Sequence, residues 1–190
     1  MERRPLLLCL ALATVALAGC AHQVGGNPTA AAGFHPAPTT TPRGTPVTSG
    51  VQIPTPRTLE GVDTCTLLQP DDLAGLGGVR GGPRRNQLYP ESCLYRLGGA
   101  ADDSAAAAFY KPFEQVKAQQ PEGSPVLTKG HSTWLRCRAD QGYQTCSAAI
   151  AVRPDRTLAV VLSRRDTPRE KVVEALNQLA VTALERLPTT

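Results

Sequence analysis

Residues 135–152, LRCRADQGYQTCSAAIAV, decide the fold of this chain, because they predict a β-hairpin with a defined register. Apolar side chains occupy every second position of residues 135–139 and again of residues 146–152. Alternation with a period of two is typical of strands that have one buried face. Gln141 and Gly142 lie between the two runs and fit a two-residue turn. We therefore expect two antiparallel strands that share one apolar face.

The same turn predicts which residues of the two strands pair. It places Asp140 opposite Tyr143 and, three steps further along, Cys137 opposite Cys146. This parity makes the two cysteines a non-hydrogen-bonded pair, the closer kind, with Cα atoms about 4.5–5.5 Å apart. A disulfide fits that spacing. Both cysteines also fall on the apolar face, so two independent patterns predict one register and a Cys137–Cys146 disulfide.

The remaining cysteine pair follows by elimination. Cys9 and Cys20 belong to the N-terminal segment discussed below, which leaves Cys65 to pair with Cys93. An even number of cysteines in an oxidising compartment predicts disulfides, and loop entropy gives about 2.5 kcal/mol for the shorter closure and about 3.5 kcal/mol for the longer. Zinc is the alternative, but no two of the four cysteines have the short spacing of a zinc-ligand pair, so we expect no metal.

A helix with clear boundaries is predicted at the C-terminal end. Thr167 is expected to cap it, Pro168 to take its first position and Glu170 to complete a capping box. Its apolar residues recur at helical spacing and should pack on the sheet. They are Val172, Leu176, Leu179, Ala180, Ala183 and Leu187.

Shorter elements complete the predicted architecture. We expect a helical turn over residues 65–68, a helix from Pro70 to a glycine stop at residues 77–78, and a brief helix over residues 112–120. Strands are expected at residues 93–97 and 158–163, the second after a turn at residues 154–155. Residues 105–110 are ambiguous, because four alanines favour helix and two aromatic residues favour strand. The predicted fold is α+β, with a small antiparallel sheet packed against a C-terminal helix and a short N-terminal helix, held by two disulfides.

The first twenty residues predict export and lipid attachment. Two arginines precede an apolar run over residues 6–18, which is too short to cross a bilayer as a helix and fits a secretory signal. The sequence Leu17-Ala18-Gly19-Cys20 resembles a bacterial lipobox, in which the cysteine receives a diacylglyceryl group before cleavage. We expect residues 1–19 to be removed and lipidated Cys20 to anchor the chain at the extracytoplasmic face of the cell membrane, with palmitate among the acyl chains. Arg3-Arg4 leaves export by either the general or the twin-arginine route open.

A tether and one domain are expected after the anchor. Residues 21–58 contain seven prolines and eight threonines without apolar periodicity, which is typical of a flexible segment. We assign residues 20–58 to the lipidated cysteine and this Pro/Thr-rich tether, and residues 59–190 to a single extracytoplasmic α+β domain. From Glu60 onward the chain has 16 Lys and Arg against 15 Asp and Glu. Without a basic cluster, nucleic acid is not an expected partner.

No catalytic motif is recognisable in the predicted domain. It has one histidine, His131, which we expect at the surface or in a loop, and the neighbouring Ser132 is poorly placed to pair with it. Asp71-Asp72 and Asp102-Asp103 fit a helix start and a turn. There is no nucleophile elbow, no zinc-protease helix, no phosphate loop and no Cys-x-x-Cys. We expect no enzyme and no cofactor.

The whole pattern resembles an actinobacterial lipoprotein family known as domain of unknown function 3558. The resemblance lies in the lipobox and tether, in residues 63–68 with Pro70 and residues 73–77, in Cys93-Leu94-Tyr95, and in a terminal helix that ends in Leu187-Pro188. The chain departs from it at Tyr95, where Trp is frequent, and at Gln69, where Thr or Ser is common. The resemblance implies an α+β domain at the cell envelope without an established reaction.

These observations favour a binding or interaction module in the cell envelope. Its partner is expected to be an envelope protein, a cell-wall component or a small ligand, bound through the sheet or the loops around residues 80–89. The alternative is a lipid or small-molecule carrier, and a hydrolase acting through His131 is a distant third.

Overall fold

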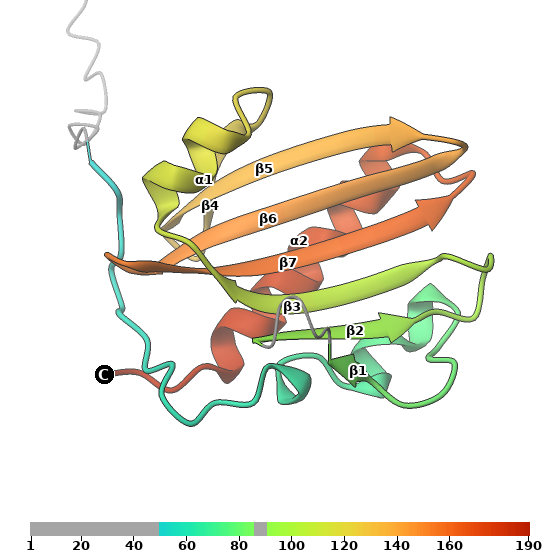
Figure 1. The fold of residues 1–190 in the computed structure, drawn as a ribbon, viewed down its shortest axis with the longest axis horizontal. Helices are drawn as coiled ribbons and strands as arrows, with labels where there is room; N and C mark the ends of the chain where they lie inside the picture. The colour runs from blue at the N-terminus through green and yellow to red at the C-terminus, as the bar shows by residue number, and fades with distance from the viewer. Residues whose placement is uncertain (1–49, 86–90) are drawn as a thin grey trace, which may run out of the picture. The chain divides into compact units, whose positions relative to one another are not determined.

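The computed structural model describes residues 50–85 and 91–190, which form an α+β domain built on one antiparallel sheet (Figure 1). The seven strands are β1 (Arg84–Arg85), β2 (Ser92–Arg96), β3 (Ser104–Tyr110), β4 (Ser124–Thr128), β5 (His131–Asp140), β6 (Tyr143–Arg153) and β7 (Arg156–Arg165). The helices are the 3-10 helices η1 (Thr64–Thr66) and η2 (Pro70–Leu76), and the α-helices α1 (Phe113–Gln119) and α2 (Arg169–Arg186). The expected fold class is confirmed.

The strands lie in the order β1-β2-β3-β7-β6-β5-β4. Two meanders, β1 to β3 and β4 to β7, meet where β3 pairs with β7. The connection between the two meanders contains α1. As a result β4 is the last strand on its side of the sheet, although it lies in the middle of the sequence.

The hairpin of β5 and β6 has the predicted register. Asp140 pairs with Tyr143 and Cys137 pairs with Cys146. Gln141 and Gly142 form the two-residue turn with φ angles of 48° and 80°, as a type I′ turn requires. The Cys137–Cys146 disulfide joins Cα atoms 4.1 Å apart. Hairpin pairing and cross-link therefore agree with the sequence pattern.

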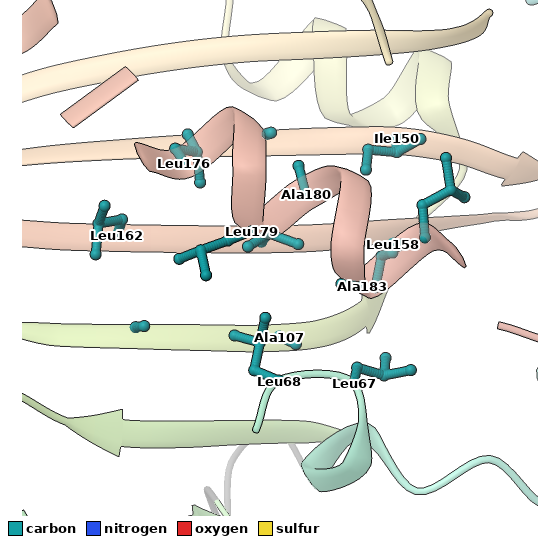
Figure 2. Close-up of a cluster of buried hydrophobic side chains, with 14 of the residues drawn as sticks. Leu67, Leu68, Ala107, Ile150, Leu158, Leu162, Leu176, Leu179, Ala180 and Ala183 are labelled. Atoms are coloured by element: carbon teal, nitrogen blue, oxygen red, sulfur yellow. The ribbon is translucent and has the colours of Figure 1, made fainter. Parts of the chain in front are cut away.

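Helix α2 covers one face of the sheet, which we call the core face. Its predicted apolar stripe is buried, together with Leu184, against side chains of β6 and β7. Figure 2 shows this packing, with the labelled leucine and alanine side chains of α2 over the strands that carry Ile150, Leu158 and Leu162. The opposite face, which we call the outer face, carries the alternate residues of each strand. Among described elements, α1 is the helix that packs on the outer face, over β5 and β6.

The 3-10 helix η1 extends the covering of the core face over β2 and β3. The predicted Cys65–Cys93 disulfide joins η1 to β2 across 5.0 Å between Cα atoms. Tyr95, two residues after Cys93 in β2, points to the same face of the sheet. Its hydroxyl is 2.6 Å from the carbonyl oxygen of Cys65 and 2.7 Å from that of Leu68. Burial raises the pKa of this phenol, and the nearby carboxylates of Asp63 and Asp72 act in the same direction. Tyr95 thus fills a core position and also satisfies carbonyls at the end of η1.

An ion pair connects η2 to α2. The guanidinium of Arg186 donates to both carboxylate oxygens of Asp72, with one nitrogen 2.9 Å from Oδ1, and also to the carbonyl of Leu67. Asp72 accepts a further hydrogen bond from the backbone N–H of Gln69 at 2.7 Å, at the start of η2. The Arg186 hydrogen bond is the largest cause that lowers the pKa of Asp72. Asp72 therefore links two covering elements to each other.

Several expectations about the ends and types of elements need correction. Thr167 does not cap α2, because its hydroxyl donates to the carbonyl of Arg165 and the helix begins at Arg169 after Pro168. The expected helical turn and the expected helix near residues 64–76 are present, and both are 3-10 helices. Residues 104–110 form a strand despite their alanines, because β2 and β7 pair with both edges. Strands β1 and β4 were not predicted.

Candidate functional site

His131, the histidine of the predicted domain, is a core residue rather than the expected surface residue. Its side chain is 1% exposed, and Nδ1 lies 2.7 Å from the carbonyl oxygen of Ala151, to which it donates as an N–H. The expectation was wrong because His131 opens β5 on the core face. Ser132 follows it in the strand and therefore points to the outer face, so the two side chains cannot form a nucleophile and base pair.

The acidic candidates are held in structural roles. Asp72 bridges η2 and α2, as described above. Asp103 is buried and accepts hydrogen bonds from the backbone N–H groups of Arg165 at 2.7 Å and Ala100 at 3.0 Å, with the Arg164 guanidinium 3.4 Å away. Within residues 50–85 and 91–190, no group of three His, Cys, Asp or Glu side chains could hold a metal ion.

The loop that we expected to bind, residues 80–89, is described only in part. Arg80 donates from its guanidinium to the carbonyls of Gly98 and Gly99, and Val79 forms an isolated bridge with Leu97. Residues 86–90 lie outside the described residues, so the second half of that expectation stays a prediction. The described half is anchored to the neighbouring loop after β2.

A groove of about 480 Å³ opens beside α1 and the hairpin of β4 and β5. Four segments line it: residues 50–52, the first five residues of α1, most of β4 and the start of β5. These segments lie up to 84 positions apart, since Gly50 and Trp134 both belong to the lining. We call this site the Trp134 groove.

Trp134, the one tryptophan of the chain, lines the groove, and two neighbours fix the position of its ring. Its indole N–H donates to the carbonyl of Gln120 at 2.8 Å, so the polar atom of the ring is satisfied within the domain. Gly123 leaves room for the ring, because a Cβ there would lie 2.1 Å from Nε1. The part of the ring left for a ligand is therefore apolar.

The exposed large hydrophobic side chains of the described residues line this groove. Among the described residues, three large hydrophobic side chains are exposed: Val51 at 39%, Val126 at 40% and Leu127 at 60%. All three line the Trp134 groove. Scattered exposed apolar residues are ordinary, but several that line one groove are typical of an interaction site.

Charged side chains around the groove neutralise one another. The ammonium of Lys117 is 2.9 Å from the carboxylate of Glu114 and lies over the rings of Phe113 and Trp134, 5.8 and 6.0 Å from their centroids. Arg136, next to Trp134 on the outer face, forms an ion pair with Glu122. The backbone N–H of Glu122 itself, with the Arg136 guanidinium, holds the pKa of that carboxyl below its usual value. Little unpaired charge is left to attract an ionic ligand.

The N-terminal side of the domain forms one wall of the groove. Ser132 donates its backbone N–H to the carbonyl of Gln52 at 2.9 Å, and its hydroxyl accepts from the N–H of Gln52 at 2.8 Å. Arg57 donates to the carbonyl of Leu187 at 2.9 Å. Gln52 and Arg57, which we expected in the tether, are therefore hydrogen-bonded to the domain.

Sequence reasoning missed the groove because it missed β4. Two features of the sequence could have indicated the groove. One is the single Trp134 within an alternating run, and the other is the apolar pair Val126 and Leu127 after Pro125. No short-range sequence pattern predicts that these residues lie next to α1 and residues 50–52. Of the predicted site residues, the four disulfide cysteines pair as expected. Cys20, the predicted lipidation site, lies outside the described residues.

A family model described as "Protein of unknown function (DUF3558)" matches residues 15–186. No curated protein and no solved structure matches the chain. Within the described part of the chain, no helix is both long enough and apolar enough to span a membrane.

Proposed function

This chain belongs to the DUF3558 family, and we propose that it is a membrane-anchored cell-envelope lipoprotein whose domain binds a partner in the Trp134 groove. On this proposal Cys20 carries the lipid, the following Pro/Thr-rich segment is the tether, and residues 50–190 form the binding module on the extracytoplasmic face. The family description assigns no reaction. The sequence of the N-terminal segment supports the anchor, and the Trp134 groove supports the binding role.

The anchoring part of the proposal is supported by sequence alone. A charged start, an apolar run of thirteen residues and Leu-Ala-Gly-Cys form the pattern that lipoprotein export requires. Two or more acyl chains on Cys20 give stable membrane attachment. In a bacterial host, the full chain should incorporate labelled palmitate and sediment with membranes, whereas Cys20→Ser should do neither. Palmitate labelling that persists in Cys20→Ser would contradict this anchor.

The Trp134 groove is the observation that carries the binding part. The three exposed large hydrophobic side chains of the described residues line the same groove as one tryptophan whose polar atom is already satisfied, and Leu127 lies on the same face of the sheet as that tryptophan. Covering such a surface releases water from apolar area, which is the dominant favourable contribution to most association. The candidate groups for acid–base chemistry, His131 and Asp103, are buried and hydrogen-bonded to backbone, and therefore do not support the hydrolase alternative.

A small-molecule carrier is the second candidate, because the groove volume of about 480 Å³ is within the range of about 300–1,000 Å³ of ligand pockets. Native and denatured mass spectra of the exported full chain distinguish the two. An added mass found only in the native spectrum would favour the carrier. A protein of bare mass would favour a macromolecular partner.

Trp134 also provides a direct measurement of binding. As the one tryptophan of the chain, it reports only on the groove. A ligand that covers the ring should shift its emission to shorter wavelength, and Leu127→Asp should weaken that response. A partner that binds the full chain without any change in emission would place the site elsewhere.

A further inference from the structure

We propose that the natural occupant of the Trp134 groove is an extended, uncharged peptide segment of a partner protein, which pairs with β4 as an additional strand of the sheet. The inference rests on the proposed function, because it names the class of partner for the same groove. It is carried by the backbone of β4, by the position of Leu127, and by the size and charge of the groove.

Strand β4 ends the sheet, and within the described residues nothing pairs with its other edge. Lys129 and Gly130 form a two-residue turn with φ angles of 50° and 82°, so Thr128 and His131 are the hydrogen-bonded pair next to it. Alternation then makes Leu127 and Ser132 a non-hydrogen-bonded pair. The N–H and C=O of Leu127 consequently point away from β5. In agreement, the N–H of Ser132 points away from β4 and donates to Gln52.

Pro125 restricts how this edge can be used. It occupies the other edge-facing position of β4, opposite Trp134, and has no N–H to donate. The edge therefore offers one N–H, at Leu127, with the carbonyls of Leu127 and Pro125. Prolines on edge strands hinder continuous pairing between copies of a protein. A short added strand with one fixed register is what this edge accepts.

The side chains next to the edge fit the alternation of a strand. Leu127 lies on the outer face with Trp134, because its partner Ser132 is two residues from Trp134 in β5. An added strand would place every second side chain on that face, next to Leu127 and the groove. Backbone hydrogen bonds would then fix the register, and apolar side chains at alternate positions would cover Leu127 and the tryptophan.

Size and charge favour a peptide segment over a globular surface. Twelve residues line the groove, whereas a standard protein interface uses about 20–30 residues on each side. The charged side chains nearby, Lys117 and Glu114, are paired with each other. A ligand segment with charges in the groove would lose hydration without gaining a partner. We therefore expect a segment of a few residues that is apolar at alternate positions and uncharged.

The test is a selection followed by backbone chemistry. A random phage-displayed dodecapeptide library is selected on the exported full chain, and enriched peptides are synthesised and titrated by Trp134 emission. We expect apolar residues at every second position of the enriched sequences. N-methylation of the amide that bonds to the carbonyl of Leu127 should weaken binding about tenfold, while N-methylation of the adjacent amide should leave it nearly unchanged. Equal tolerance of methylation at every amide would overturn strand addition.

Two variants provide the matched comparison. Leu127→Asp adds a charge at the exposed edge and should reduce binding of the enriched peptides at least tenfold. Ala139→Asp adds the same charge at an exposed position of β5 outside the groove and should leave binding unchanged. Enrichment of the same peptides on Leu127→Asp would overturn the inference. So would a dimer of the full chain that Leu127→Asp dissociates, because the edge would then belong to a second copy.

The inference and the proposed function fail differently. A retained small molecule in the native mass spectrum, with no enriched peptide, would overturn strand addition and leave a binding module that acts as a carrier. Absence of palmitate on the wild-type chain would contradict the lipoprotein proposal without any effect on peptide titrations of the groove.

Discussion

The two faces of the sheet share one backbone and have very different coverings. On the core face, α2 and the two 3-10 helices bury a continuous set of leucine, valine and isoleucine side chains. On the outer face, α1 covers one end, and partly exposed residues such as Ala108, Ala159 and Val161 lie beyond it. The comparison separates two tasks. The core face provides stability through burial. On the outer face a tryptophan and a leucine stay partly exposed, next to an edge of β4 that pairs with no other described strand.

The largest expected effect comes from an apolar deletion on the core face. Leu176→Ala removes a fully buried side chain of α2 and should lower the free energy of unfolding by about 2–5 kcal/mol, because it removes burial and leaves a cavity. Val161→Ala on the outer face should cost about 1 kcal/mol or less. Urea unfolding followed by Trp134 fluorescence measures both. Equal losses would contradict the division between the faces.

The next effect concerns the two disulfides, which differ in what they join. Cys65–Cys93 ties a covering helix to the sheet over 28 positions, and Cys137–Cys146 joins neighbouring strands over 9. Replacing each pair by alanine should cost about 3.5 and about 2.5 kcal/mol respectively, following the entropy of the closed loops. Thermal unfolding of the two double variants tests the order. A larger loss from the hairpin pair would show that loop length does not govern their contributions.

A smaller effect on stability is expected at acid pH, from the Asp72–Arg186 ion pair that joins η2 to α2. The hydrogen bond from Arg186 holds the pKa of the Asp72 carboxyl below its ordinary value in the folded state, so the ionised carboxylate stabilises the fold above that ordinary value. As the pH falls through the lowered pKa, this contribution of about 1–2 kcal/mol is lost. Asp72→Asn should be less stable at neutral pH and should flatten the decline below pH 4. An unchanged acid profile in Asp72→Asn would show that other carboxylates cause it.

The smallest effect on stability is expected at the groove. Leu127→Asp alters a side chain that is 60% exposed and should change the free energy of unfolding by less than about 0.5 kcal/mol. The same substitution should abolish most peptide binding, as argued above. A large loss of stability would instead make Leu127 part of the core and remove it from the binding surface.

Local patterns predicted more of the fold than of the site. The hairpin register followed from alternation and one turn, and the stripe of α2 followed from helical spacing, because both depend on residues close in sequence. The predicted N-cap at Thr167 was wrong. The hydroxyl of Thr167 donates to the carbonyl of Arg165, and the helix begins at Arg169, one residue later than predicted. The sequence left the secondary structure of the alanines in β3 ambiguous. They form a strand because β2 and β7 pair with the two edges of β3.

The sequence by itself determined which family the chain resembles, that its four domain cysteines form two disulfides, and which side of α2 is buried. These conclusions depend on periodicity, spacing and parity, which are properties of the chain before it folds. Only the tertiary structure decided that His131 is buried, that β4 is an edge, and that Trp134 faces α1 and residues 50–52. Such features arise when distant segments meet, and the burial and hydrogen bonding that fix them exist only in the assembled sheet.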